Sequence, residues 1–187
     1  VVTDFQDVTK RKYFVVGCTT NPGDCDNFRK QLPSNVKVFY NPEFIAQGSI
    51  INDLRTADMV LLGADPFADN DKVISDIRTL YEKIQTTRAI VCSMSTTAAE
   101  ITKIAINCFL TTKISYANML GDVLHLSGCG DEVSGVLSAI GTDSRIGRKY
   151  LGYGFGYGGP CLPRDNRAFA AFAKNLGLEY NLGHVTD

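Results

Sequence analysis

Short runs of apolar, largely β-branched residues alternate with polar stretches along the first half of the chain. Turn signals such as Asn21-Pro22-Gly23 and Asn41-Pro42 follow these runs, which is typical of buried strands that end in loops. The predicted strands are residues 13–16, 36–40, 59–62 and 89–92. Residues 72–85 repeat apolar side chains at helical spacing, which predicts an amphipathic helix. Apolar strands that alternate with helices favour an α/β fold with a mostly parallel sheet.

A long helix is predicted after the last strand. Thr97 and Glu100 have the spacing of a capping box, in which a hydroxyl and a carboxylate satisfy unpaired N–H groups at a helix start. Residues 98–127 contain no proline and only one glycine, Gly121. A helix of ~30 residues is roughly 45 Å long, too long for a small domain, so we expect it to link two bodies.

The rest of the chain is predicted to be helical apart from one glycine-rich loop. Residues 131–140 form a short helix, and residues 145–159 form the loop. Asp165 is predicted to open a last helix as its acidic N-cap.

Composition and charge narrow the classes of partner. The 187 residues include 44% hydrophobic side chains, enough for a core, and carry a formal net charge of -1. Nucleic acid and an anionic membrane surface are therefore not expected as partners. No apolar stretch approaches the ~18 residues that span a bilayer, and no signal segment opens the chain. None of the six cysteines has C-x-x-C spacing, so no metal site is predicted and a cytoplasmic protein with reduced thiols is expected.

The segment from Gly158 to Asp165 carries the strongest chemical signal. Cys161 follows flexible backbone and precedes a helix, whose positive end, together with Arg164, would favour thiolate over thiol. A buried cysteine in a tight turn explains the same residues about equally well.

Lys103 and Asn107 share one face of the predicted long helix. Their neighbours are apolar, so the lysine would be desolvated or point into a polar cleft, where it would stabilise an oxyanion or move a proton. A surface lysine with a buried stem is the commoner case and is favoured from these residues alone.

Two other segments also have a chemical and a structural interpretation. Glu43 follows the second strand, where α/β sheets bind ligands, and would act as an acid or base. A solvent-facing or helix-capping glutamate is the commoner case. Arg145 would bind a phosphate, unless residues 141–147 are a plain turn.

These segments, taken in order, make the sequence similar to the UDP-glucose/GDP-mannose dehydrogenase family. The resemblance runs over essentially the whole chain and rests on residues 18–23, 41–44, 100–110, 145–147 and 158–165. It implies that the C6 alcohol of a nucleotide sugar, most closely UDP-glucose, is oxidised by two NAD to the uronic acid through a cysteine thioester.

The resemblance implies roles for the matching residues. Cys161 is the nucleophile, Lys103 stabilises the oxyanion, and Asn107 contacts the oxyanion and water.

For the hydrolysis of the thioester, the resemblance implies that Asp165 orients water or the lysine, that Glu43 is the acid or base, and that Thr19 holds the water. It also implies that Thr19 and Arg164 lie near the cofactor, although the family usually has lysine where this chain has Arg164.

The implied substrate contacts gather in the glycine-rich loop and its surroundings. They are Phe44, Arg145, Tyr150, Leu151, Tyr153, Gly154 and Gly158. Arg145 matches an arginine that one subunit of a homodimer lends to the other.

The resemblance also predicts the organisation of the chain. Residues 1–94 are expected to be the last part of a Rossmann-like NAD-binding domain, and residues 95–187 a helical domain for dimerisation and substrate binding. The G-x-G-x-x-G fingerprint and a base-binding domain are expected outside this sequence, so these residues alone should be inactive. The only dense glycine cluster, residues 152–159, does not follow a strand.

Some residues depart from the family pattern. Gln47 replaces a frequent second glutamate, and Pro160 replaces a common serine. Two alternatives stay open: GDP-mannose or an N-acetylated sugar as substrate, or a non-catalytic dimerisation module.

Overall fold

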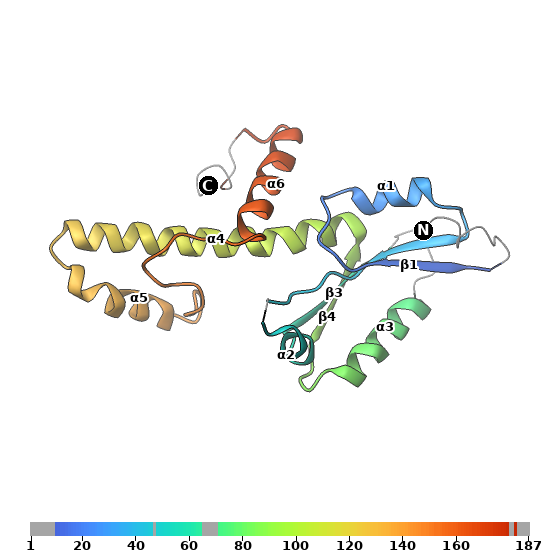
Figure 1. Ribbon diagram of the computed structural model, residues 1–187, viewed down its shortest axis with the longest axis horizontal. Helices are drawn as coiled ribbons and strands as arrows, with labels where there is room; N and C mark the ends of the chain where they lie inside the picture. Colours follow the sequence, from blue (N-terminus) through green and yellow to red (C-terminus); the bar gives the residue numbers. More distant parts are fainter. Residues whose placement is uncertain (1–9, 47, 65–70, 180–181, 183–187) are drawn as a thin grey trace. The chain divides into compact units, whose positions relative to one another are not determined.

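The computed structural model describes residues 10–46, 48–64, 71–179 and 182. It divides the chain into two compact units, Val1–Lys103 and Ile104–Asp187, each of which is described by itself (Figure 1). Gln47 lies outside the described residues.

Unit 1 is built on a four-stranded sheet in the order β1-β2-β3-β4. Its strands are β1 (Lys12–Val16), β2 (Val36–Tyr40), β3 (Met59–Ala64) and β4 (Ile90–Ser95). The pairs β1–β2 and β3–β4 are parallel, each joined by a helix, as a parallel crossover requires. The predicted strands and the α/β fold are confirmed.

The middle of the sheet differs from a purely parallel arrangement. Strands β2 and β3 pair antiparallel, through Tyr40 and Gly63 alone. Gly63 makes this close approach feasible, because a Cβ there would lie 2.9 Å from the Cβ of Tyr40. The sheet is thus mixed: one strand pair, β2–β3, is antiparallel, and the other two are parallel.

Helices cover both faces of the sheet. Helix α1 (Asp24–Gln31) lies over one face and α3 (Asp71–Ile84) over the other, with the short α2 (Ile50–Arg55) between β2 and β3 (Figure 1). Val38 and Tyr40 pack with Cys25 of α1, whereas Phe39 packs with Val73 of α3. Successive side chains of a strand point to opposite faces, so β2 contributes to two cores.

Helix α4 (Thr96–Leu126) is continuous over 31 residues, as the absence of helix breakers predicted. The predicted capping box is wrong. Ser95 Oγ instead accepts from the Ala98 N–H at 3.3 Å. Thr97 and Glu100 both lie inside the helix, and their side chains bind other segments of unit 1. Tertiary partners outcompete the local capping contacts.

Unit 2 packs two helices beside the rest of α4. A 3₁₀ turn (Gly130–Glu132) leads into α5 (Val133–Thr142), and α6 (Leu162–Asn175) follows the glycine-rich loop. Val133 and Leu137 of α5 form a small core with Ala117 of α4.

The predicted start of the last helix at Asp165 is wrong. Cys161 is the N-cap of α6, and Pro163 lies in its first turn, where a missing N–H costs little. Asp165 lies a turn inside the helix, and its side chain is 1% exposed.

Among the residues that the structure describes, no helix is both long and apolar enough to cross a membrane. The same residues contain no group of three or more His, Cys, Asp or Glu side chains arranged to hold a metal ion.

We predict that Gly63→Ala destabilises unit 1 by about 1–3 kcal/mol. The new methyl would lie 3.0 Å from the Cβ of Ala99 and 3.0 Å from the Cα of Thr96, besides its contact with Tyr40. Gly135→Ala in α5 is the matched control, because nothing lies within 4 Å of its added Cβ, and alanine favours a helix by about 1 kcal/mol over glycine. Urea unfolding followed by circular dichroism measures both, and an unchanged midpoint for Gly63→Ala would contradict the prediction.

Candidate active site

Lys103 lies in α4 at the end of unit 1, and its side chain is buried. Its side chain is 8% exposed, its ammonium donates to the backbone carbonyl of Glu43, and it lies 4.1 Å from the ring centroid of Phe44. A buried cation needs such partners to offset the loss of water. The interpretation as a surface lysine is therefore wrong.

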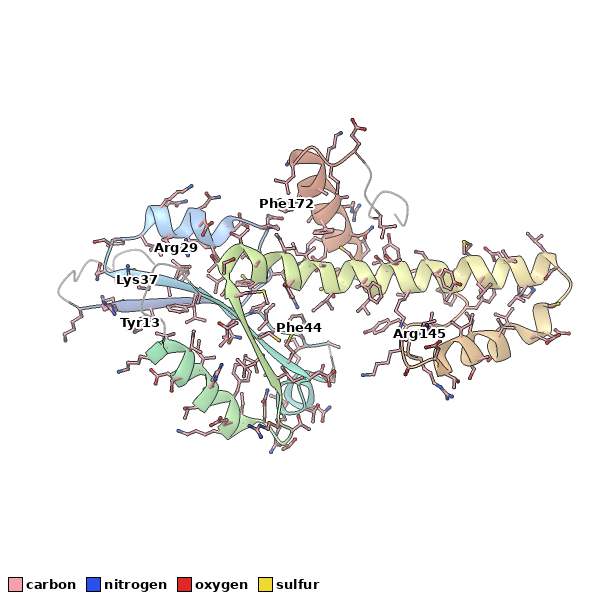
Figure 2. All side chains as sticks on the ribbon, turned by 180° about the vertical axis from the view of Figure 1, so that it is seen from behind. Tyr13, Arg29, Lys37, Phe44, Arg145 and Phe172 are labelled. Carbon is pink, nitrogen blue, oxygen red and sulfur yellow. The ribbon has the colours of Figure 1, made fainter. Side chains whose placement is uncertain are left out.

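The segment that receives Lys103 is fixed to the end of the sheet. The backbone N–H of Asn41 donates to the carbonyl of Val16 at 2.8 Å, and the side-chain amide of Asn41 donates to the carbonyl of Leu61 at 3.0 Å. Tyr81 donates to the Asn41 side-chain oxygen at 3.0 Å. Glu43, two residues after Asn41, is exposed, and Phe44 (labelled in Figure 2) is half-buried. A fixed backbone thus presents Glu43 to solvent at a strand end.

Residues 17–23 connect β1 to α1 and contain Thr19 and Thr20, both half-buried. The carboxylate of Glu100 in α4 organises this loop. It accepts from the Thr20 hydroxyl at 2.9 Å, from the Gly23 N–H at 2.7 Å and from the Cys25 N–H at 2.9 Å. Sequence reasoning missed Glu100 as a loop contact. The available signal was a carboxylate three residues before Lys103, on the same face of the predicted helix.

Asp165 is the centre of a polar network in unit 2. One carboxylate oxygen accepts from the Asn107 amide at 2.7 Å, and the other from Arg164 Nε at 2.7 Å. The hydrogen bond to Asp165 is the main reason that the pKa of Arg164 is raised. The structure therefore brings together two predicted catalytic residues, Asn107 and Asp165, and a predicted cofactor contact, Arg164.

The same helix turn presents Cys161 at its start. The backbone N–H of Asp165 donates to the Cys161 carbonyl at 2.9 Å, and the Cys161 residue is exposed. Next to Asp165, the buried Asn166 accepts from Thr111 at 3.1 Å and donates to the Tyr157 hydroxyl at 3.3 Å. The Asn166 side chain thus joins the start of α6, which carries the thiol, to α4 and to the glycine-rich loop.

Burial distinguishes Cys25 and Cys108 from Cys161, whereas Cys18 is exposed as Cys161 is. All six cysteines are free. Burial, with a smaller contribution from the charge of Asp165, raises the pKa of Cys108 to about 11. Burial, with a smaller contribution from Glu100, raises the pKa of Cys25 far above its usual range. Both thiols stay protonated near neutral pH and are poor nucleophiles.

The glycine-rich loop is bound to α4 through its middle. Tyr153 donates to Asp122 at 3.0 Å, and its ring fits against Gly121, where an added Cβ would lie 2.0 Å from the ring. The N–H of Gly154 donates to the side-chain oxygen of Asn118 at 3.0 Å. The structure thus places Tyr153 and Gly154, both predicted substrate contacts, against the helix.

The other predicted substrate residues of unit 2 have different surroundings. Leu151 packs against the α4–α5 core, while Tyr150 is half-exposed with a positive φ of 64°. Gly158 is exposed. Arg145 (labelled in Figure 2) has a side chain that is 86% exposed and an ion pair with Asp143 at 2.6 Å. Its exposure agrees with a role at an outer surface.

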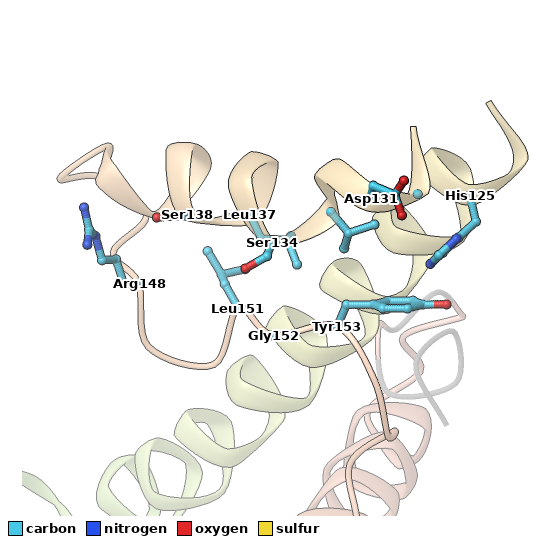
Figure 3. A pocket seen from close by; sticks show the side chains of 11 residues that line it. His125, Asp131, Ser134, Leu137, Ser138, Arg148, Leu151, Gly152 and Tyr153 are labelled. Carbon is cyan, nitrogen blue, oxygen red and sulfur yellow. The ribbon is translucent and has the colours of Figure 1, made fainter. Parts of the chain in front are cut away.

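A pocket of about 540 Å³ lies between α5, the end of α4 and the glycine-rich loop (Figure 3). Tyr153 and His125 line it side by side, with ring centroids 5.3 Å apart. Asp131 and Arg148 add one charge of each sign. None of the predicted catalytic residues lines this pocket.

The described residues do not fit the pyrophosphate of the NAD that the resemblance implies. A dinucleotide needs a glycine-rich turn with free N–H groups at a helix start. The start of α1 follows a strand, but its N–H groups at Gly23 and Cys25 already donate to Glu100. Of the predicted cofactor contacts, Thr19 lies in the loop before α1 and Arg164 lies in α6. These two residues alone do not make a pyrophosphate site.

Comparison with known proteins matches most of the chain to two models of one family. Residues 3–85 match the NAD binding domain of the UDP-glucose/GDP-mannose dehydrogenase family, and residues 97–186 match its central domain. The first of these matches gives NAD as the cofactor.

Individual relatives agree with the family models. The UDP-glucose 6-dehydrogenase of Drosophila melanogaster is 36% identical over 141 residues, which are 75% of this chain and 29% of that protein. UDP-glucose 6-dehydrogenase 1 of Arabidopsis thaliana is 35% identical over 165 residues, 85% of this chain and 34% of that protein. The chain thus spans about a third of the length of these curated relatives.

A solved structure gives the same result. The UDP-glucose dehydrogenase from the hyperthermophilic archaeon Pyrobaculum islandicum superimposes with a TM-score of 0.81 at 32% identity, over 93% of this chain and 40% of that one. With the buried polar residues of α4 and the exposed Cys161 already described, these matches establish that the chain belongs to the UDP-glucose/GDP-mannose dehydrogenase family.

Proposed function

We propose that the protein containing these residues oxidises the C6 alcohol of a nucleotide sugar to the acid, with UDP-glucose as the favoured substrate. The observation that carries the proposal is the network of Asn107 and Arg164 around the buried Asp165, at the helix turn whose N-cap is Cys161. The relatives named UDP-glucose 6-dehydrogenase support the choice of substrate. Six free cysteines support a reducing compartment, the cytoplasm.

Cys161 is the proposed nucleophile. Its thiolate adds to the C6 aldehyde, a C–S bond forms, and the carbonyl electron pair moves to oxygen as an oxyanion. Lys103 and Asn107 are proposed to stabilise that oxyanion, an ammonium by charge and an amide by donation. The thioester on Cys161 lies two two-electron oxidations beyond the alcohol, and NAD, near Thr19 and Arg164, would supply the hydride acceptor for both.

Water then releases the acid. Its oxygen bonds to the thioester carbon, the C–S bond breaks, and the sulfur leaves as thiolate. We propose that Glu43 accepts the proton of the water, that Thr19 holds that water, and that Asp165 orients it through Asn107. Burial of Asp165 and its two donors support a fixed orientation of the Asn107 amide.

The remaining predicted contacts serve binding. Phe44, Tyr150, Leu151, Tyr153, Gly154 and Gly158 are proposed to shape the sugar site, and Thr19 and Arg164 to lie near the cofactor. The side chains of Tyr153 and Leu151 already contact α4 and α5, so these two residues are proposed to bind the substrate through their backbone atoms. Arg145 is proposed to reach the sugar site of a partner subunit.

The partner is proposed to be a second copy of the chain, bound through α4. Exposed apolar side chains recur along this helix in steps of seven, three, four and three residues: Phe109, Tyr116, Met119, Val123 and Leu126. Their exposed fractions run from 46% to 90%. Such steps gather the side chains on one stripe of a helix, the pattern by which two helices associate.

The proposed substrate is tested by measuring NADH formation with the protein expressed from the complete reading frame. We expect NADH to form with UDP-glucose at a kcat/KM at least tenfold above that with GDP-mannose or a UDP-N-acetyl sugar, because the relatives named above are UDP-glucose dehydrogenases. GDP-mannose dehydrogenase from Pseudomonas aeruginosa, with a TM-score of 0.59 at 26% identity over 96% of this chain and 42% of that one, makes GDP-mannose the matched comparison. A preference for GDP-mannose would contradict the proposed substrate.

We predict that Cys161→Ala abolishes net turnover, because no thioester can form without the sulfur. NADH absorbance measures the loss, and retained substrate affinity in calorimetry shows that the site still folds. Cys129→Ala, a half-buried cysteine in the loop after α4, is the control and should keep turnover within about twofold. Turnover by Cys161→Ala at the rate of the unsubstituted protein would exclude the proposed mechanism.

We predict that Met119→Glu with Val123→Glu converts the dimer to a monomer, because two charges would then be buried at the contact. Sedimentation velocity gives the mass of each species. Leu178→Glu, at an exposed leucine outside α4, should leave the dimer intact. A protein that sediments as a monomer before any substitution would contradict the proposed association.

A further inference from the structure

Glu100 is a charged residue in a buried position, where an apolar side chain would stabilise the core without needing hydrogen-bond donors. Its side chain is fully buried, and each carboxylate oxygen accepts from a donor in the loop of residues 17–23. Oε1 accepts from the Thr20 hydroxyl and the Cys25 N–H, and Oε2 accepts from the Gly23 N–H. Burying a carboxylate is costly unless such donors offset the loss of water. The arrangement fixes the loop of residues 17–23 to α4.

A neutral amide does not replace this carboxylate. Glutamine has the same shape, but one of its two terminal atoms is an NH₂ group, which donates and cannot accept. Either the Gly23 N–H or both Thr20 and Cys25 would then face a donor. A buried donor without an acceptor raises the free energy of the folded state, so the loop would shift or become less ordered.

The residues bound in this way neighbour the residues proposed for hydrolysis of the thioester. Thr20 contacts Glu100 directly, and Thr19 precedes it in the loop. Lys103 lies one turn along α4 from Glu100 and donates to the carbonyl of Glu43. Within unit 1, α4 therefore fixes both polar segments, one through Glu100 and the other through Lys103.

A second contact joins α1 to α4 but does not include the threonines of the loop. Asp26 of α1 accepts from Thr96 at 3.2 Å and from Thr97 at 3.2 Å, and pairs with Arg29 at 2.5 Å. Removing the Thr97 hydroxyl weakens the contact between the same two helices while Glu100 and Thr20 stay bonded. It is therefore a matched control for an effect on stability alone.

We propose that Glu100 is a positioning residue for hydrolysis of the thioester: its buried carboxylate fixes the loop of residues 17–23 so that the loop holds the attacking water. The inference rests on the proposed function and adds a residue to it. Glu100 touches neither substrate nor water and exchanges no proton. In the step that it supports, the water oxygen bonds to the thioester carbon, Glu43 takes the proton, and Cys161 leaves as thiolate.

The test compares Glu100→Gln with Thr97→Ala in the protein from the complete reading frame, with UDP-glucose and NAD. For Glu100→Gln we expect kcat to fall at least about tenfold and KM for UDP-glucose to fall with it, so that kcat/KM stays within about threefold, because only the last step is slowed. Hydrolysis would become the slow step, so two NADH should form per site in a rapid burst before slow turnover. Intact-mass spectrometry should then find the acyl adduct on Cys161. Thr97→Ala should show no burst, no adduct and nearly unchanged kcat.

Thr20→Val is the second variant, in case Glu100→Gln does not fold. It removes one donor and leaves the carboxylate in place, so a smaller fall in kcat with the same burst and adduct is expected. A fall in kcat without burst or adduct, or equal effects of Thr97→Ala and Glu100→Gln, would overturn the positioning role. If the unsubstituted protein forms no NADH with any nucleotide sugar, the proposed function fails instead.

Discussion

The structure depends on the pairing of polar side chains that α4 buries along one row. Thr96, Glu100, Lys103, Asn107 and Thr111 recur at steps of four, three, four and four residues, which helical geometry places on one stripe. Four of them are at most 8% exposed: Thr96, Glu100, Lys103 and Thr111. A buried polar group without a partner costs more than a hydrogen bond contributes. Each of these four therefore has to contact a specific partner, and the half-buried Asn107 contacts Asp165.

Those contacts explain why the surrounding segments have one conformation. In unit 1, Glu100 binds the loop before α1, and Lys103 binds the backbone after β2. In unit 2, Asn107 binds Asp165, and Thr111 binds Asn166. The polar row thus determines the loops around it, while the apolar cores of each unit supply most of the burial.

The strands and the long helix were predictable because their signals are local. A run of β-branched residues, or a stretch without helix breakers, has the same preference in any surroundings. Helices α1 and α2 carried no such signal, because α1 buries only Cys25 and α2 is six residues long with no buried residue. The antiparallel contact of β2 with β3 also depends on a pair distant in sequence, Tyr40 and Gly63.

The candidate site was predictable in its residue types and less so in its contacts. The four-residue spacing of Lys103 and Asn107 predicted a shared helix face, but no local pattern shows that Asp165 is buried between Asn107 and Arg164. Because tertiary contacts leave no local pattern, the sequence predicted Asp165 as an N-cap and Glu100 as part of a capping box. An acidic residue near a helix start is usually bound by that start, and here tertiary donors bind both carboxylates instead.

Gly121 shows how a position that touches no proposed reactant governs the glycine-rich loop. Glycine inside a helix costs about 1 kcal/mol relative to alanine, and α4 tolerates it at the point where the ring of Tyr153 lies. Even a methyl group there would displace the ring and with it the neighbouring hydrogen bond between Gly154 and Asn118. The helix therefore gives up some intrinsic stability to admit an aromatic ring. One added carbon on its surface would displace a loop several residues long, so the shape of the proposed sugar site can change without altering any of the proposed catalytic residues.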